Sequence, residues 1–407
     1  MRVYHFTEQP YPDAWDKDPV SIRATLPSKW MDPARAADLY HEYLDEWQLA
    51  DELGLDIFVN EHHSTATCLT ASANLILGIL ARTTKRARLL GLGFPIANNS
   101  NPLRVAEELA MIDVISRGRL EMGFVKGVPY EIHPANSLPV RHTERFWEAH
   151  DFILKALTTH DGPFSWEGEF FQYRNVNVWP RPFQQPHPPV WISANSVPSA
   201  IPIAQRGHVL GTVMTGYKAK ALFDQYRKAW REAGKPEPVP LDRLCYAGFV
   251  GVGKTRAEGH RRGNLVMAYL RTNAIVGEAF KNPPGFIPAG PAAKMIKQTG
   301  TMTFLSHDLF AKDGTNLGPF TEASLQGTID GGLMFTGTPD EVYQQMVDFY
   351  DTVGGFGHFL MMAQAGTMNY ADTAENLTLF AREVLPRITE YHRKRQKEMG
   401  LPARAMA

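Results

Sequence analysis

The chain of 407 residues has little cysteine, almost no net charge and no long apolar run. Its two cysteines, Cys68 and Cys245, lack the spacing of a redox or metal motif, which argues against a secreted disulfide framework. The formal net charge of -1 provides no field for nucleic acid or an anionic membrane surface. The most apolar run, Leu69 to Ala81, contains polar residues and is too short to span a bilayer, and the first residues form no apolar signal core. We therefore predict a cytoplasmic protein without a nucleic-acid or membrane partner.

Two catalytic signatures are also missing. No G-x-G-x-x-G follows a predicted strand, so the sequence shows no dinucleotide site, which favours an external reductase. No H-E-x-x-H is present, and the first predicted strand offers only His5 where metal-dependent barrel hydrolases carry His-x-His. We therefore predict no metal site.

One motif suggests a nucleotide site. Gly248 to Thr255 fits the G-x-x-x-x-G-K-[ST] phosphate-loop pattern. Leu244 to Val252, however, has the composition of one continuous strand, which would place the first glycine of the motif inside the sheet. Thr255 and Glu258 also have the spacing of a helix capping box. We interpret the match as a coincidence.

The sequence contains a regular alternation of strand-like and helical stretches. Its hydrophobic content of 44% supports a large core, and the strand-like stretches are apolar on both faces, as buried parallel strands are. Eight strand–helix units favour a closed α/β barrel of the (β/α)8 TIM type, in one domain covering residues 1–407. The predicted strands are Val3–Phe6, Asp56–Asn60, Arg88–Phe94, Leu120–Val125, Val190–Ser193, Val209–Met214, Leu244–Val252 and Phe356–Met361.

Three insertions interrupt this alternation, after the first, fourth and seventh predicted strands: residues 8–29, 162–189 and 282–330. The last insertion is rich in glycine, proline and polar residues, and it is long enough to cover the barrel mouth. We consider it a candidate lid. A surface insertion or an oligomer contact explains the same composition equally well.

The stretch from Asn101 to Gly127 predicts a helix followed by a strand that ends in a cationic loop. Asn101 can cap the helix, and Pro102 suits its first turn. The strand Leu120–Val125 then delivers Lys126 and Gly127 at its carboxyl end, where ligands bind in α/β proteins. A lysine beside a glycine can hold a phosphate there while the backbone approaches closely.

A second candidate set follows the predicted strand Val190–Ser193. Asn195, Ser196 and Ser199 offer amide and hydroxyl groups at the start of a predicted helix, where free N–H groups and the helix dipole favour an anion. An ordinary capped helix explains the same residues. Because Lys126 follows the neighbouring predicted strand, we favour one shared anion site.

Glu61, His62 and His63 end the second predicted strand. Side chains alternate along a strand, so Glu61 and His63 share one face and His62 takes the other. An imidazole titrates near neutral pH and can move protons. Hydrogen bonding of both histidines to neighbouring loops is the alternative interpretation.

Together these segments resemble the bacterial-luciferase-like family of flavin-dependent monooxygenases. The family pattern Asn-Pro-Leu-Arg, Ala-Glu-Glu, Asp, Ser-x-Gly-Arg and Gly-x-x-Lys-Gly is present from Asn101 to Gly127. Further matching fragments occur in the family's order: NEHHS at Asn60–Ser64, QPHPPVWISANS at Gln185–Ser196, TGTPDEV at Thr336–Val342 and FAREVLPRI at Phe380–Ile388.

The resemblance implies a two-component monooxygenase that receives reduced FMN from a separate flavin reductase. The bound flavin and O2 would oxygenate a small, hydrophobic organic substrate through a flavin hydroperoxide. By the same resemblance, the catalytic residue is His62, which lies beside the flavin ring. A non-proline cis peptide bond at Gly93–Phe94 supports that ring.

The resemblance also implies a set of phosphate ligands and leaves alternatives open. Asn195, Ser196, Ser199 and Lys126 would bind the flavin phosphate. A related branch of the fold uses a reduced deazaflavin and transfers hydride without oxygen, although the EHH pair and the Asn-Ser turn resemble the FMN branch more closely. Because fold alone does not establish activity, a non-catalytic flavin-binding protein is the second alternative. We also expect a homodimer or a higher homo-oligomer.

Overall fold

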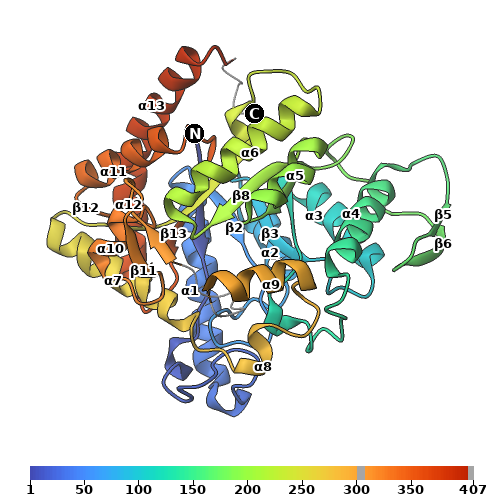
Figure 1. Cartoon of the computed structure of the whole chain (residues 1–407), viewed down its shortest axis with the longest axis horizontal. Helices are drawn as coiled ribbons and strands as arrows, with labels where there is room; N and C mark the ends of the chain where they lie inside the picture. The colour runs from blue at the N-terminus through green and yellow to red at the C-terminus, as the bar shows by residue number, and fades with distance from the viewer. Residues whose placement is uncertain (300–307, 402–407) are drawn as a thin grey trace.

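A closed ring of parallel strands forms the centre of the molecule (Figure 1). The computed structural model describes residues 1–299 and 308–401. Strand β13 pairs with both β1 and β9, and β9 also pairs with β8, so the ring closes on itself. The predicted (β/α)8 barrel is therefore confirmed. Its strands are β1 (Arg2–Thr7), β2 (Asp56–Val59), β3 (Leu89–Pro95), β4 (Leu120–Val125), β7 (Val190–Ser193), β8 (Val209–Val213), β9 (Leu244–Val252) and β13 (His358–Gln364).

A further parallel strand, β12 (Met334–Gly337), was not predicted. It pairs with the carboxyl half of β9, where Met334 lies opposite Phe249, whereas β8 pairs with the amino half, where Leu210 lies opposite Leu244. Strand β9 is long enough to hold two short strands along one edge. The four residues of β12 lie shortly after a Gly-Gly pair and the end of the predicted lid, and a run this short is a weak strand signal.

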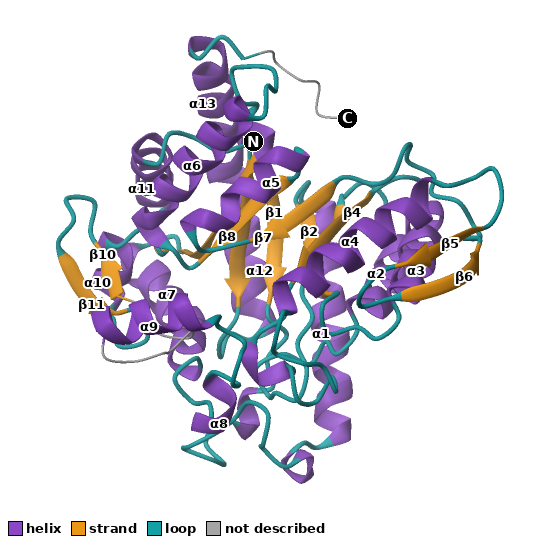
Figure 2. Ribbon diagram, turned by 45° about the vertical axis from the view of Figure 1, so that its right-hand side comes forward, coloured by secondary structure: helices purple, strands orange, loops and turns teal. Residues whose placement is uncertain are grey.

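Helices surround the barrel (Figure 2). The predicted cap at Asn101 is present, because its side chain accepts from Arg104 N, and Asp32 caps the first long helix in the same way through Ala34 N. The last helical segment contains a π-helical turn at Phe380–Val384. The helices are α1 (Pro33–Glu52), α2 (Ala73–Thr83), α3 (Pro102–Ile115), α4 (His142–Thr158), α5 (Ala200–Arg206), α6 (Ala219–Glu232), α7 (Arg256–Thr272), α11 (Pro339–Thr352), α12 (Tyr370–Leu379) and α13 (Leu385–Glu398).

Three segments lie outside the strand–helix alternation. The first joins β1 to α1, and the second carries a hairpin of β5 (Phe164–Glu167) and β6 (Gln172–Val176) between α4 and β7. The third joins α7 to β12. It contains α8 (Glu278–Lys281), α9 (Ala289–Thr299), the hairpin of β10 (Asp308–Phe310) and β11 (Asn316–Pro319), and α10 (Leu325–Asp330).

The predicted lid at 282–330 is not the irregular segment that its composition suggested. Residues 300–307 of it lie outside the described residues. Within 308–330, Leu309 and Phe320 are buried in a hydrophobic cluster with strands β9 and β12, and Leu325 packs against the same cluster. This half of the segment is therefore part of the core, because removing it would expose apolar side chains of the barrel.

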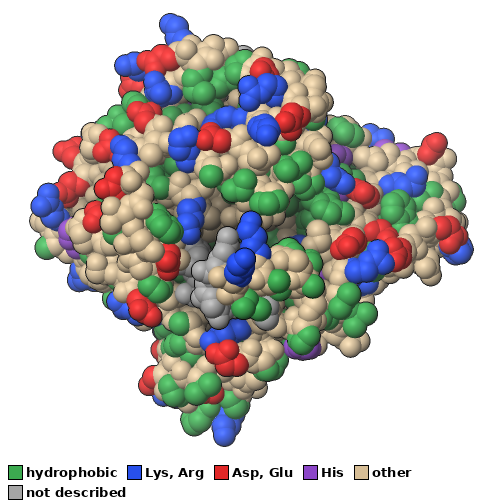
Figure 3. Space-filling model, in the orientation of Figure 1, with side chains coloured by type: hydrophobic (Ala, Val, Ile, Leu, Met, Phe, Trp, Pro, Cys, Tyr) green, Lys and Arg blue, Asp and Glu red, His purple; other side chains and the backbone are tan. Residues whose placement is uncertain are grey.

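The carboxyl ends of the strands lie on one side of the barrel, together with α8 and several long loops (Figure 2). The amino terminus lies on the opposite side. Acidic and basic side chains are interspersed over the face seen in Figure 3, as the near-zero net charge requires. Within residues 1–299 and 308–401, no helix has the length and apolar character needed to cross a membrane.

Candidate active site

His62 follows β2 and contacts a carboxylate delivered by a different strand. Its Nδ1 lies 2.9 Å from Oε1 of Glu131, which belongs to a short 3-10 turn after β4. Glu131 is buried, and it also accepts hydrogen bonds from the backbone N–H of His63 at 3.0 Å and of Val128 at 3.3 Å. The Tyr130 hydroxyl lies 3.4 Å from the same imidazole nitrogen. The fold thus brings the ends of β2 and β4 together around one histidine.

The charges around His62 favour its protonated form. Burial acts to lower the pKa of His62, but the charge of Glu131 and its hydrogen bond outweigh burial and raise the pKa above its ordinary value. The carboxylate of Glu8 raises this pKa further, and Arg23 opposes it. An imidazole in these surroundings can both give and take a proton at working pH.

His63 has a different side-chain partner. Its Nε2 lies 3.2 Å from Oε1 of Glu61, whose Oε2 accepts from Ala73 N at 2.8 Å at the start of α2. The hydrogen bond to Glu61 raises the pKa of His63. The two imidazoles therefore have separate carboxylate partners. Strand β2 ends at Val59, so Glu61, His62 and His63 lie in the loop beyond it, and the predicted alternation of a strand does not apply to them.

A buried polar network beside His62 was missed by sequence reasoning. Asn60 donates from Nδ2 to Oε2 of Glu8 at 2.6 Å, and Gln9 donates from Nε2 to Oδ1 of Asn60 at 3.2 Å. Tyr269 of α7 lies beside the same groups: it acts to lower the pKa of Glu8, and the Arg23 guanidinium lies over its ring. Burial raises the pKa of Glu8, although His62 and Arg23 oppose the shift. The available signal was the position of Glu8, a carboxylate directly beyond an apolar strand.

Arg23 connects three segments at this end of the barrel. It donates from Nη1 to the Tyr130 hydroxyl and from Nη2 to Oγ1 of Thr272, both at 3.2 Å. Its guanidinium carbon lies 5.5 Å from the ring centroids of Tyr130 and Tyr269. Arg23 lies in a segment that the sequence described only as an insertion, so no motif pointed to it.

Lys126 is placed at the carboxyl end of β4 as predicted. Its Nζ lies 3.4 Å from Oγ1 of Thr143 and 5.3 Å from the ring centroid of Phe286, a residue of the predicted lid. Burial lowers the pKa of Lys126. Gly127 takes the left-handed conformation at φ 91°, and an added Cβ would lie 2.5 Å from Nδ2 of Asn98. A side chain at position 127 would therefore collide with the neighbouring loop.

The Asn-Ser turn lies at the end of the adjacent strand β7, since Phe124 of β4 pairs with Ile192 of β7. The side chain of Asn195 is engaged, because its Oδ1 accepts from Oγ1 of Thr212 at 3.0 Å and from Val213 N at 3.2 Å. The hydroxyls of Ser196 and Ser199 contact each other at 2.5 Å.

The serine hydroxyls differ from the predicted arrangement in one respect. Neither one caps the helix that follows, which starts as the 3-10 turn Val197–Ser199 before α5. Lys126 and the serine turn follow two strands, β4 and β7, that pair with each other. No hydrogen bond joins Lys126 to this turn in the part of the chain that the structure describes. One cation, an amide and two hydroxyls are donors of the kind that a phosphate monoester needs.

The non-proline cis bond occurs at Leu92–Gly93, one bond before the predicted Gly93–Phe94. Gly93 is needed for the close approach of β3 and β4, because a Cβ on it would lie 2.5 Å from Cγ1 of Val125. Phe94 is buried in the hydrophobic core. A bound ring could therefore meet the backbone here but not the Phe94 side chain.

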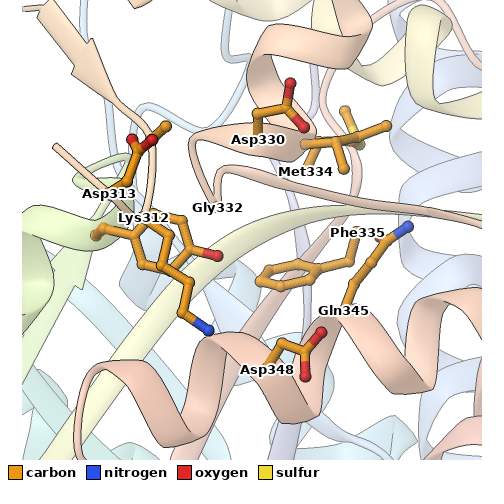
Figure 4. A pocket seen from close by; sticks show the side chains of 11 residues that line it. Lys312, Asp313, Asp330, Gly332, Met334, Phe335, Gln345 and Asp348 are labelled. Carbon is orange, nitrogen blue, oxygen red and sulfur yellow. The ribbon is translucent and has the colours of Figure 1, made fainter. Parts of the chain in front are cut away.

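A cavity of about 600 Å³ lies elsewhere, among the β10–β11 turn, the start of β12 and helix α11 (Figure 4). The predicted flavin residues do not line it. Its walls are Tyr217, Ala311, Lys312, Asp313, Ile329, Asp330, Gly332, Met334, Phe335, Gln345 and Asp348. No group of three or more His, Cys, Asp or Glu side chains is arranged to hold a metal ion in residues 1–299 and 308–401.

The phosphate-loop match is explained by ordinary structure. Gly248 lies inside the continuous strand β9. Thr255 caps α7, and Oε2 of Glu258 accepts from the backbone N–H of Lys254 at 2.9 Å and of Thr255 at 3.4 Å. A protein carboxylate therefore occupies N–H groups that a phosphate loop would offer to a nucleotide.

Known proteins of similar sequence include an oxygenase. The oxygenase component of a flavin-dependent trigonelline monooxygenase from Acinetobacter baylyi is 33% identical over 161 residues, which are 38% of this chain and 43% of that protein. An uncharacterized protein from Sinorhizobium fredii is 32% identical over 54% of this chain and 63% of its own length. The chain thus spans less than two thirds of the length of either relative.

Two solved structures show the same fold. The oxygenating constituent of 3,6-diketocamphane monooxygenase from Pseudomonas putida, in complex with FMN, superposes with a TM-score of 0.68 at 18% identity, over 95% of this chain and 98% of that one. An F420-dependent secondary alcohol dehydrogenase superposes with a TM-score of 0.62 at 16% identity, over 88% and 96%. The sequence model of the luciferase-like monooxygenases matches residues 24–355, well over half of the chain. The chain therefore belongs to the luciferase-like monooxygenase family.

Proposed function

We propose that this protein is the oxygenase component of a two-component flavin-dependent monooxygenase. It would take reduced FMN from a separate flavin reductase and use O2 to oxygenate a small, hydrophobic organic substrate. The observation that carries the proposal is the pairing of His62, which follows β2, with Glu131 at the carboxyl end of the barrel. Glu131 follows β4, the strand that also leads to Lys126, and β4 pairs with β7, which leads to the Asn-Ser turn. The Acinetobacter relative is itself named as an oxygenase component.

In this proposal the residues have distinct tasks. Lys126, Ser196 and Ser199 would hold the flavin phosphate, and Asn195 would fix the turn against β8 and offer its amide. The backbone at Gly93 would support the ring. Bound reduced FMN would supply the electrons that activate O2, and His62 would hold or move a proton at its Nε2.

Hydride transfer without oxygen is the competing function, and the structural similarity to the F420-dependent dehydrogenase favours it. The two chemistries differ in the fate of oxygen. We would mix the protein with pre-reduced FMN, a panel of hydrophobic aldehydes, ketones and terpenes, and ¹⁸O2. The proposal expects one ¹⁸O atom in a product; products without ¹⁸O would favour hydride transfer, and no product with reduced FMN or a reduced deazaflavin would favour a non-catalytic flavin-binding protein.

Replacement of Lys126 tests the phosphate assignment. Lys126→Ala is expected to weaken FMN binding by roughly 1–3 kcal/mol, because it removes a charge-assisted hydrogen bond to phosphate. Ser196→Ala should have a smaller effect of the same kind. Affinities for reduced FMN and reduced riboflavin can be compared by anaerobic fluorescence titration, and riboflavin binding should change little.

A matched control is available for this experiment. Lys155 on α4 also lies over an aromatic ring, with Nζ 5.0 Å from the centroid of Phe164, but on a different part of the surface. Lys155→Ala should leave the affinity for both flavins unchanged. Equal losses of FMN and riboflavin affinity in the Lys126→Ala protein would mean that Lys126 has a structural role only.

The lid proposal is now restricted to the residues around Phe286. This ring covers Lys126 and lies 5.8 Å from the ring centroid of His142, so it occupies the approach to the proposed phosphate site. The later residues 308–330 are tied to the core, as described above. A lid movement would therefore involve the part of the segment before α9.

We also propose that helices α2 and α3 form the contact between copies in a homo-oligomer. Leu75 and Met111 are 66% and 47% exposed, and Ile79, Val114 and Ile115 are exposed nearby. The two helices pack side by side, joined by a hydrogen bond from Asn74 to Glu108. An apolar face of this kind on a large protein commonly marks an interface.

The double variant Leu75→Glu, Met111→Glu is expected to shift the protein to a monomer, because buried carboxylates without partners oppose association. Light scattering after size-exclusion chromatography measures the mass. Val20→Glu is the control, since Val20 is 69% exposed but lies in the β1–α1 segment. A wild-type monomer, or an oligomer that survives the double variant, would contradict this interface.

A further inference from the structure

We propose that Glu131 is the positioning residue for His62: its carboxylate keeps the proton on Nδ1 and turns Nε2 toward the ligand at the barrel mouth. The role of Nε2 in catalysis rests on the proposed function. The orientation of the His62 imidazole rests only on its contacts. Neither the family pattern around Lys126 nor the histidine motif contains this glutamate.

The contacts of Glu131 make its carboxyl group a hydrogen-bond acceptor. Oε1 accepts from His63 N at 3.0 Å and faces Nδ1 of His62 at 2.9 Å, while Oε2 accepts from Val128 N at 3.3 Å. Backbone N–H groups can only donate, so both oxygens act as acceptors, and Oε1 is held in place to accept from the imidazole as well. Glu131 is also buried, so water does not compete for these contacts.

An accepting oxygen at this position selects the tautomer of the imidazole. Nδ1 must carry hydrogen to bond with Oε1, in the neutral as well as in the protonated ring. Nε2 has no hydrogen bond to any residue that the structure describes, and the His62 side chain is 21% exposed. Nε2 is therefore the nitrogen that can exchange a proton with a bound ligand.

Four groups from two segments of the chain face His62. Glu131 and Tyr130 come from the turn after β4, Glu8 follows β1, and Arg23 comes from the β1–α1 segment. The two carboxylates raise the pKa of His62, whereas burial and Arg23 lower it. Neutralising Glu131 must therefore lower the pKa of His62. As the pH rises, the imidazole would then lose its proton at a lower pH than in the wild type.

A second glutamate–histidine pair, Glu61 and His63, serves as a control for Glu131 and His62. Glu61 contacts His63 at 3.2 Å and caps α2 through Ala73 N, so it also combines a histidine with a backbone N–H. Its side-chain contacts are with His63 and Ala73 and not with the imidazole of His62. Glu61→Gln therefore removes the same kind of charge at nearly the same place in the sequence without touching His62.

The experiment uses ¹⁵N-histidine-labelled full-length protein without flavin. Long-range ¹H–¹⁵N spectra report the tautomer and the titration of each histidine, and His62→Gln assigns the signal. In the wild type, His62 should carry its neutral-form proton on Nδ1. In Glu131→Gln, His62 should titrate at lower pH and gain the Nε2–H tautomer, whereas Glu61→Gln should shift His63 alone.

Turnover provides the second measurement. Glu131→Gln is expected to lower kcat by roughly 10²-fold and to move the pH profile toward lower pH, since orienting carboxylates act through the tautomer of their histidine. Glu131→Asp, which keeps the charge, should restore much of the wild-type pH profile.

The outcomes separate this inference from the proposed function. A wild-type His62 with its neutral-form proton on Nε2 overturns the inference without any variant, as does an unchanged His62 titration in folded Glu131→Gln. If the spectra agree but the wild type incorporates no ¹⁸O, the proposed function fails while the Glu131–His62 orientation stands.

Discussion

Replacing His62 with alanine is expected to lower turnover by about 10²- to 10⁴-fold, the usual contribution of a positioned general acid or base. The fold and most of the FMN affinity should be retained, because His62 is partly exposed. Its main partner, Glu131, also accepts hydrogen bonds from two backbone N–H groups and so keeps its position without the imidazole. Single-turnover product formation with pre-reduced FMN measures the chemical step apart from binding.

His63→Ala is the matched control for this prediction. The imidazole of His63 contacts Glu61 and not Glu131, so its loss should change stability more than chemistry. Thermal melting and flavin titration of both variants should accompany the kinetics. Wild-type turnover in His62→Ala, or a chemical defect confined to His63→Ala, would show that the assignment of the catalytic histidine is wrong.

Replacing Arg23 with alanine should cause the largest loss of stability, about 3 kcal/mol or more. The buried guanidinium donates to Tyr130 and Thr272 and offsets the charge of the buried Glu8, so its removal leaves polar groups and a carboxylate without compensation. The pKa of Glu8 should rise further, because Arg23 acts to lower it. Urea unfolding measures the change in free energy.

Two control variants separate charge from geometry. Arg23→Lys keeps the charge but lacks the planar fork that reaches two hydroxyls, so an intermediate loss is expected. Arg35→Ala removes an exposed ion pair with Asp13 at 3.4 Å and should change stability by no more than roughly 0.5 kcal/mol. If Arg23→Ala also lost less than about 1 kcal/mol, the buried network would depend on groups other than Arg23.

Local sequence determined most of the barrel. Short, mostly apolar runs such as Leu120–Val125 favour buried strands, and cap residues such as Asp32 mark where helices begin. Eight such units left a closed barrel as the simplest architecture, and the positions directly beyond strands pointed to Lys126, His62 and the Asn-Ser turn. These signals are local, because they depend on the period of side chains and on the chemistry of chain ends.

Tertiary structure decided which of these residues have partners. The strand β12 forms only because β9 offers an edge beyond the end of β8. Likewise, the partner of His62 lies 69 residues away on the turn after β4, and Arg23 meets Thr272 across 249 residues. Local sequence patterns do not indicate which residues so far apart in the chain will come into contact. The closing of the ring brings the strand ends to one mouth, and burial there makes each charge depend on its neighbours. The sequence therefore determined the candidate histidine, and only the folded barrel decided which carboxylate holds it.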